Sequence, residues 1–219
     1  MARHAIDLVR LATLCALVVL GACASQPTPK SGSAKLPIPP LPAIAHGAVS
    51  SAEVRAAKVK SLLQAGVAPL QAHAVPAFLD TLQGRLKSAI AGNTAQLARV
   101  QGEVVVVLPT RVLFVPDAVE LTPAGGKLLA TLATALRDES ALLIEVSCHT
   151  DRLGNAADNE SFTARRAEIV RAALTAASMD AEHVMAVGPG DQFPLADNAT
   201  ADGRRLNRRV ELSLIPITR

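Results

Sequence analysis

Arg166 stands where the helical pattern of its neighbours calls for a core residue. On a helical wheel, Arg166 and Asn159 fall near the centre of an apolar arc, whereas Glu168 and Arg171 point away from it. The arc is formed by Phe162, Ile169, Val170, Ala173, Leu174 and Ala177. A buried guanidinium without an anion costs several kcal/mol, more than a hydrogen bond to a neutral group returns. We therefore expect Arg166 to face a carboxylate or an anionic ligand.

Two arrangements satisfy this charge. In the first, Arg166 forms an internal ion pair with Asp151 or Asp158. In the second, Arg166 and Asp151 share a pocket, where Arg166 binds a carboxylate, Asp151 binds a cationic group and Asn159 orients the ligand. The spacing alone slightly favours the internal pair. The loop from 151 to 159 leaves a predicted strand and enters a predicted helix, a position where sites often lie.

Other kinds of site have weaker support. Ser147, His149 and Asp151 alternate along one strand face, which is not the geometry of a catalytic triad, and no G-x-S-x-G motif is present. His149 has no second metal ligand at a suitable spacing. The chain has a net charge of +3, no Trp or Tyr and 4 Phe, which argues against nucleic-acid binding. We predict no catalytic residue, no metal and no cofactor.

The N-terminus has the features of an export signal. Arg3 and Arg10 precede an apolar run, residues 11–20, that is shorter than the roughly 20 residues of a membrane-spanning helix. The run ends in Leu20-Gly21-Ala22-Cys23, which resembles the lipobox of bacterial lipoproteins. This resemblance implies that residues 1–22 are removed, that Cys23 is lipidated, and that Ala24 permits sorting to the outer membrane of a Gram-negative cell. The alternative is an ordinary signal peptide with an incidental cysteine.

A linker is expected over residues 23–49. It contains prolines at positions 27, 29, 37, 39, 40 and 42 and has no amphipathic period. As polyproline II it would reach roughly 70–80 Å. Cys148 would be the cysteine left after lipidation, so no internal disulfide is predicted.

Residues 50–103 are predicted to form two helices and a hairpin. Ser50 and Glu53 have capping-box spacing, and Gly66 ends the first helix. The second helix follows Pro76 and ends near Gly92. Two β-prone runs, 95–100 and 103–109, flank Gln101-Gly102 and are typical of a hairpin.

Residues 104–219 alternate between strand and helix patterns. We predict strands at 111–114, 141–148, 182–188 and 208–215, with a helix over 123–137 and another after residue 159. The expected fold is an α/β (α+β) sandwich: a mixed sheet with helices packed on one face, preceded by the helical segment and hairpin.

Three stretches resemble the signature blocks of the OmpA-like peptidoglycan-binding domain. They are "LFVPDAVELTPAG", "CHTDRLGNAADNESFTARRAEIV" and "NATADGRRLNRRVEL", in the expected order, and the likeness covers roughly residues 104–215. It implies that Asp151 binds the ammonium of diaminopimelate in the peptide stem and that Arg166 binds its carboxylate. The positions implied to line or support the pocket are Phe114, Asp117, Thr150, Asn159 and Arg204, while Asn207 to Arg209 are implied to be more structural.

The sequence departs from the family at Cys148, where a Gly is usual, at Phe162-Thr163 in place of Leu-Ser, and at Pro189. We expect Cys148 to be a packed small hydrophobe. The resemblance implies a non-catalytic lipoprotein that tethers the outer membrane to peptidoglycan from the periplasmic face. The alternatives are a lipoprotein that binds an envelope protein partner through residues 51–100 and, less favoured, an envelope hydrolase.

Overall fold

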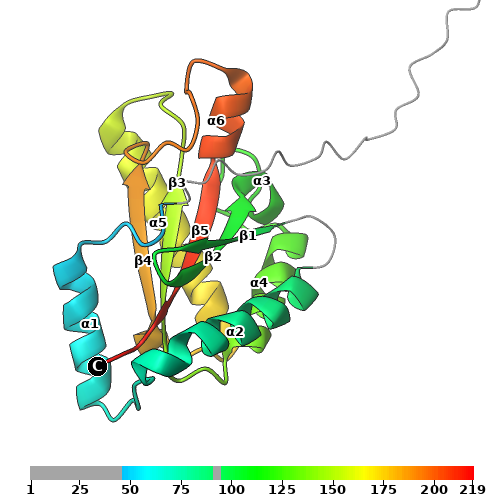
Figure 1. Ribbon diagram of the computed structural model, residues 1–219. Helices are drawn as coiled ribbons and strands as arrows, with labels where there is room; N and C mark the ends of the chain where they lie inside the picture. Colours follow the sequence, from blue (N-terminus) through cyan, green and yellow to red (C-terminus); the bar gives the residue numbers. More distant parts are fainter. Residues whose placement is uncertain (1–45, 91–94) are drawn as a thin grey trace, which may run out of the picture. The chain divides into compact units, whose positions relative to one another are not determined.

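A computed structural model of the chain describes residues 46–90 and 95–219 (Figure 1). The predicted signal peptide, Cys23 and the linker up to residue 45 lie outside the described residues. Within the described ranges, no helix is both long and apolar enough to cross a bilayer.

Five strands form one mixed sheet in the order β1-β2-β5-β3-β4. The strands are β1 (Gln96–Val100), β2 (Glu103–Pro109), β3 (Leu142–His149), β4 (Val184–Gly190) and β5 (Arg209–Pro216). Only the β3–β4 pair among them is parallel. The predicted hairpin is confirmed: Gln101 and Gly102 both have positive φ, 49° and 85°, as a two-residue type I′ turn requires.

The main core lies between the sheet and three helices, α2 (Val75–Ala89), α4 (Pro123–Leu136) and α5 (Ala156–Ala176). Alternate residues of β3 and β5, such as Ile144 and Leu212, point into it. Cys148 is fully buried there, and burial raises the pKa of its thiol, so it packs as a small hydrophobe. α5 approaches β4 very closely, because a Cβ at Gly188 would lie 1.9 Å from the backbone nitrogen of Ala164.

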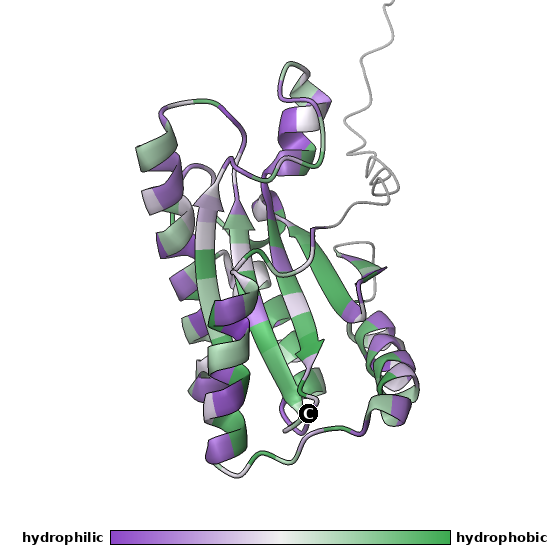
Figure 2. Cartoon of the chain, turned by 60° about the vertical axis from the view of Figure 1, so that its left-hand side comes forward, coloured by the Kyte–Doolittle hydropathy of each residue, from purple (hydrophilic) through white to green (hydrophobic). Residues whose placement is uncertain are grey.

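A further helix, α1 (Ala52–Gln64), covers part of the opposite face of the sheet. Its buried residue Leu62 packs with Leu143 and Ile217. Figure 2 shows strongly apolar strands between helices with polar outward surfaces. The prediction that helices pack on one face of the sheet therefore holds for α2, α4 and α5, whereas α1 packs on the other face.

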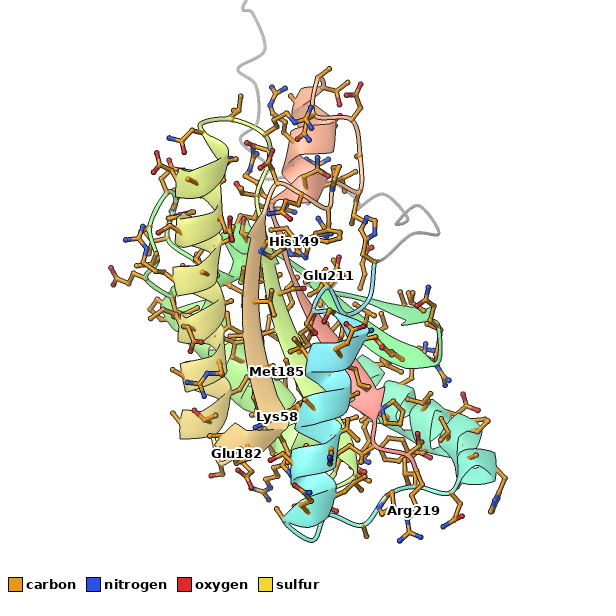
Figure 3. The ribbon with its side chains drawn as sticks, turned by 90° about the vertical axis from the view of Figure 1, so that its left-hand side faces the viewer. Lys58, His149, Glu182, Met185, Glu211 and Arg219 are labelled. Carbon is orange, nitrogen blue, oxygen red and sulfur yellow. The ribbon has the colours of Figure 1, made fainter. Side chains whose placement is uncertain are left out.

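That second face also carries a buried polar layer beyond the N-terminal end of α1 (Figure 3). Its members on β3 and β5 are Glu145, Ser147, His149, Arg209, Glu211 and Ser213. Residues 46–50 cover part of this layer: the amides of Val49 and Ser50 donate to Glu145 Oε1 at 2.5 and 3.1 Å. The structure thus places the end of the predicted linker against the sheet.

Several local predictions were wrong. Residues 111–114 belong mostly to a helical turn, α3 (Thr110–Leu113), because β2 already ends at Pro109 and short apolar runs suit either structure. Ser51, not Ser50, caps α1, since the Ser50 hydroxyl bonds to Glu145. α6 (Ala201–Asn207) was not predicted. Two short 3-10 helices, η1 (Ala72–Ala74) and η2 (Ala181–His183), complete the elements.

Candidate ligand-binding site

A cavity of about 460 Å³ opens at the end of the sheet where strands β2 and β3 finish and β5 begins. We call it the Arg166 pocket. It is lined by Thr110, Arg111, Phe114, Val115, Pro116, Asp117, Thr150, Asp151, Leu153, Asn159, Phe162, Arg166 and Arg208. The wall therefore combines two aromatic rings with charged groups of both signs.

Arg166 forms the buried cationic side of the pocket and is 7% exposed. Its Nε and Nη2 both donate to the carbonyl of Ala118, at 2.9 and 2.6 Å. The guanidinium carbon lies 4.6 Å from the ring centre of Phe114 and 4.2 Å from that of Phe162. No carboxylate of the described residues forms an ion pair with Arg166, so the internal pair with Asp151 or Asp158, one of the two arrangements considered from the sequence, is absent.

The N-terminal part of α5 is fixed by polar contacts. Asn155 caps the helix by accepting from the amide of Asp158 at 2.8 Å. Thr163 Oγ1 donates to the carbonyl of Asn159 at 2.8 Å and accepts from the amide of Gly190 at 3.0 Å. These bonds tie α5 to the end of β4 and set the direction of Arg166 one turn further along.

The apolar arc of α5 is rotated from its predicted position. Thr163, Ala167, Val170 and Leu174 are buried with Arg166, whereas Ile169 is 38% exposed. Placing Ile169 in the arc was therefore wrong. The close approach to Gly188 selects small residues for the contact face, which a hydrophobicity pattern does not register.

The turn from 115 to 120 supplies the acceptor for Arg166. The amide of Val115 donates to the Glu120 carbonyl at 2.9 Å, and Asp117 has φ of 53°, a left-handed conformation that Asp tolerates. This directs the Ala118 carbonyl at the guanidinium. Burial lowers the pKa of Arg166, and the nearby charge of Asp117 opposes that shift. The pocket therefore holds a partly desolvated cation.

Asp151 forms the anionic side of the pocket. It is 4% exposed; its Oδ1 accepts from the amide of Leu153 at 3.0 Å, and its Oδ2 accepts from Arg208 Nη1. The side chain of Arg208 is 43% exposed. Because that partner is reached by solvent, a ligand ammonium can share or replace it at modest cost.

Most of the predicted site residues meet in this pocket. Phe114, Asp117, Thr150 and Asn159 line it together with Asp151 and Arg166. Arg204 is not among the lining residues: its Nη1 donates to the carbonyls of Asn198 and Ala199, at 2.9 and 3.0 Å, and holds the loop before α6.

Sequence reasoning missed seven lining residues, among them Arg111, Leu153 and Arg208. Arg208 belongs to the "NRR" block, which was interpreted as structural, so the block itself was the available signal. Leu153 is 64% exposed, unusual for a leucine, but the sequence alone does not reveal that exposure. Arg111 was assigned to a strand, which hid its place at the pocket.

The Ser147–His149 pair lies apart from this pocket. His149 is 2% exposed on the second face of the sheet, where its Nε2 lies 3.1 Å from Ser147 Oγ. Burial, then the charges of Arg209 and His46, hold the pKa of His149 well below its ordinary value. Asp151 instead bonds Leu153 and Arg208, so the three residues do not form a relay. Across the described ranges, no group of three or more His, Cys, Asp or Glu is arranged to hold a metal ion.

Comparison with known proteins connects this geometry to a family. Residues 113–208 match the OmpA family. The chain is 29% identical over 140 residues to "Probable lipoprotein YiaD" of Escherichia coli (strain K12), which covers 64% of each chain. It is 35% identical over 101 residues to "Peptidoglycan-binding protein ArfA" of Mycobacterium tuberculosis (strain ATCC 25618 / H37Rv), covering 46% of this chain and 31% of that one. The chain thus spans less than two thirds of either relative.

A solved structure agrees with these sequence matches. The cell wall anchor of the T6SS from Pseudomonas aeruginosa superposes with a TM-score of 0.55 and 28% identity, over 62% of this chain and 96% of that chain. The superposition includes most of that structure, so the mixed sheet and its helices form a shared architecture. In sequence, residues 113–208 are thus similar to the OmpA family, and in fold the chain is similar to that cell wall anchor.

Proposed function

We propose that this protein is a non-catalytic lipoprotein that binds the diaminopimelate of peptidoglycan stem peptides and tethers the outer membrane to the cell wall. The observation that carries the proposal is the charge arrangement of the Arg166 pocket. Arg166 and Asp151 line the same cavity without pairing with each other, so each can serve a charge of the ligand.

The free end of a diaminopimelate side chain has one ammonium and one carboxylate. Arg166 uses Nε and Nη2 on Ala118, which leaves Nη1 to donate to a ligand carboxylate. Asp151 accepts the ammonium beside Arg208, and Asn159, whose Nδ2 lies 3.4 Å from the Asp151 carbonyl, closes that side. The rings of Phe114 and Phe162 hold the guanidinium in place and exclude water from it.

The tethering role rests on the lipobox and on the modest strength of a single pocket. A few charge-assisted hydrogen bonds contribute about 1.5–3 kcal/mol each before association costs, so we expect weak binding to one stem peptide. Acyl chains on Cys23 would hold the pocket beside a polymer of repeated sites, which raises the effective concentration. The names of the relatives, a lipoprotein and a peptidoglycan-binding protein, support this role.

Sedimentation with purified diaminopimelate-type sacculi tests the proposal. The full chain, purified in detergent, should pellet with sacculi and should release no soluble muropeptides on long incubation. A chain that stays in the supernatant would contradict binding, and muropeptide release would favour the envelope hydrolase instead.

Substitution Cys23→Ser should abolish lipidation. The thiol is the acylated group in the lipoproteins that this N-terminus resembles, so the variant should accumulate as an unlipidated precursor away from the outer membrane. Metabolic labelling with a fatty-acid analogue, followed by membrane fractionation, measures both effects. Undiminished label in the variant would refute the assignment of Cys23, and Cys148→Ser serves as the control because that thiol is buried in the core.

Substitution Phe162→Leu should weaken binding without unfolding the protein. It removes one of the two rings on Arg166 but keeps an apolar side chain at a half-buried position. A cation–π contact contributes about 0.5–1 kcal/mol at accessible sites, so affinity for sacculi should fall roughly two- to fivefold. Sedimentation and a thermal melt of the same variant measure this; unchanged affinity would show that Phe162 does not position Arg166.

The alternative of a partner-binding module in residues 51–100 loses support from the packing. Leu79, Leu82 and Leu86 of α2 are buried in the same core as the strands, and β1 extends the sheet. This region therefore completes the domain, and its deletion would disrupt the fold itself.

A further inference from the structure

Arg111 is one of the residues that line the Arg166 pocket, and it also lines a smaller neighbouring cavity with Arg205. It is an exposed residue of α3 and directly follows Thr110, which also lines the pocket. The amide and Oγ1 of Thr110 both donate to the Arg208 carbonyl, at 3.1 and 3.3 Å. The backbone bond places Arg111 next to Arg208, and Arg208 in turn pairs with Asp151.

The charges in the pocket do not balance. Among the lining residues, all within the described part of the chain, three are arginines, Arg111, Arg166 and Arg208, and two are aspartates, Asp117 and Asp151. Arg208 pairs with Asp151, and Asp117 acts on Arg166. Arg111 forms no hydrogen bond or ion pair with any residue that the structure describes.

The surroundings of Arg111 add to this imbalance. Partial burial, and then the positive charge of Arg205, lower the pKa of Arg111. Arg205 has its own partner in Asp202, at 3.1 Å, but that carboxylate is 86% exposed and therefore largely screened by solvent. Arg111 thus lies near a second guanidinium, that of Arg205, whose own counter-charge is well solvated.

We propose that Arg111 forms a second anion subsite, which binds another carboxylate of the stem peptide beside the diaminopimelate. The inference rests on the proposed function. The free end of diaminopimelate brings one positive and one negative charge, so it leaves the surplus cation of the pocket unmatched. A ligand with one further negative charge would match it.

The stem peptide offers such a group in two places. One is the α-carboxylate of the γ-linked D-glutamate that precedes diaminopimelate, and the other is the terminal carboxylate of the D-alanine that follows it. The planar guanidinium of Arg111 suits either, because it donates two parallel hydrogen bonds to a carboxylate. An amide in place of the carboxylate offers a single acceptor oxygen and no charge.

A cycle that combines protein and ligand changes tests the subsite. Calorimetry would use the full chain in detergent and three synthetic tetrapeptides: one with both carboxylates free, one amidated at D-glutamate, and one amidated at the terminal D-alanine. For the wild type, one of the two amidations should weaken binding about fivefold or more. For Arg111→Gln, the free and amidated peptides should bind within about twofold of each other. Which amidation matters identifies the carboxylate.

The controls separate this inference from the proposed function. Arg171→Gln removes the same charge from the outer face of α5 and should keep the full preference of the wild type. Equal amidation effects in wild type and Arg111→Gln, with tight dependence on Arg166 retained, would overturn the subsite alone. If the wild type binds none of the three peptides, both the subsite and the proposed function fail.

Discussion

Binding to purified sacculi should fall at least thirtyfold in Asp151→Ala and in Arg166→Ala. Each variant removes one charge-assisted contact and leaves a charge of the ligand unmet, which costs about 2–5 kcal/mol. Arg166→Lys should also bind poorly. A single ammonium lacks the several planar donors with which the guanidinium serves the Ala118 carbonyl and a ligand carboxylate at the same time. Sedimentation over a range of protein concentrations measures the three affinities.

Thermal melts of the same variants separate lost binding from lost folding. Asp151→Ala frees Arg208, whose side chain is 43% exposed and can be hydrated, so its stability should change little. Arg166→Ala leaves the Ala118 carbonyl unpaired and should cost about 1–3 kcal/mol. Arg166→Lys can still donate to that carbonyl, so it should remain folded while binding fails. Full sacculus binding by folded Asp151→Ala and Arg166→Lys would discard the site assignment.

Glu211→Ala should destabilise the domain by about 3–5 kcal/mol. Arg209 Nε donates to Glu211 Oε1 at 2.6 Å, and the two residues are 1% and 0% exposed. Burial lowers the pKa of Arg209, and the charge of Glu211 opposes that shift. The other acceptors of Arg209 are the carbonyls of Asn207 and Phe193, at 3.3 and 3.1 Å, which do not neutralise it. Removing Glu211 therefore strands a cation inside the protein.

Urea unfolding of two further variants checks this reason. The double change Arg209→Met with Glu211→Leu should recover much of the lost stability, because apolar residues of similar volume often replace a buried ion pair without loss. Glu168→Ala breaks the exposed pair with Arg171 and should cost less than about 1 kcal/mol. A loss below 1 kcal/mol in Glu211→Ala, or a double variant no more stable than the single one, would contradict the account of this pair.

Much of the fold followed from the sequence because its signals are local. Alternation in 141–148 and 208–215 and the Gln101-Gly102 turn predicted β3, β5 and the β1–β2 hairpin, all confirmed. The resemblance to the OmpA-like domain is confirmed as well. α3 escaped prediction because four residues fit either helix or strand, and α6 because its Gly and Arg residues form no apolar stripe.

The buried polar layer and the docked segment could not be foreseen for a different reason. Glu145 and Glu211 occupy strand positions that alternation assigns to the outer, solvated face. Glu145 is buried because the end of the predicted linker, with Ser50, lies against it from about 95 positions away along the chain, and Glu211 is buried in an ion pair with Arg209. Contacts over such separations leave no mark in a local pattern.

In the pocket too, some features could be predicted from the local sequence, whereas others depend on long-range contacts. That Arg166 lies on the buried side of its helix followed from its place in the predicted apolar arc. The actual neighbours of its guanidinium, the Ala118 carbonyl and the rings of Phe114 and Phe162, depend on how the 115–120 turn meets α5. Likewise, the pairing of Asp151 with Arg208 requires the C-terminal end of β3 to lie beside the N-terminal end of β5.

Calorimetric binding of two soluble stem peptides tests the central claim most directly. One peptide contains diaminopimelate, and the other contains lysine, which keeps the ammonium but lacks the side-chain carboxylate. The wild type should bind the diaminopimelate peptide at least thirtyfold more tightly, because the lysine peptide leaves Arg166 without its anion. Arg166→Lys should lose most of this preference. Equal affinity of the wild type for both peptides would contradict recognition of diaminopimelate by Arg166.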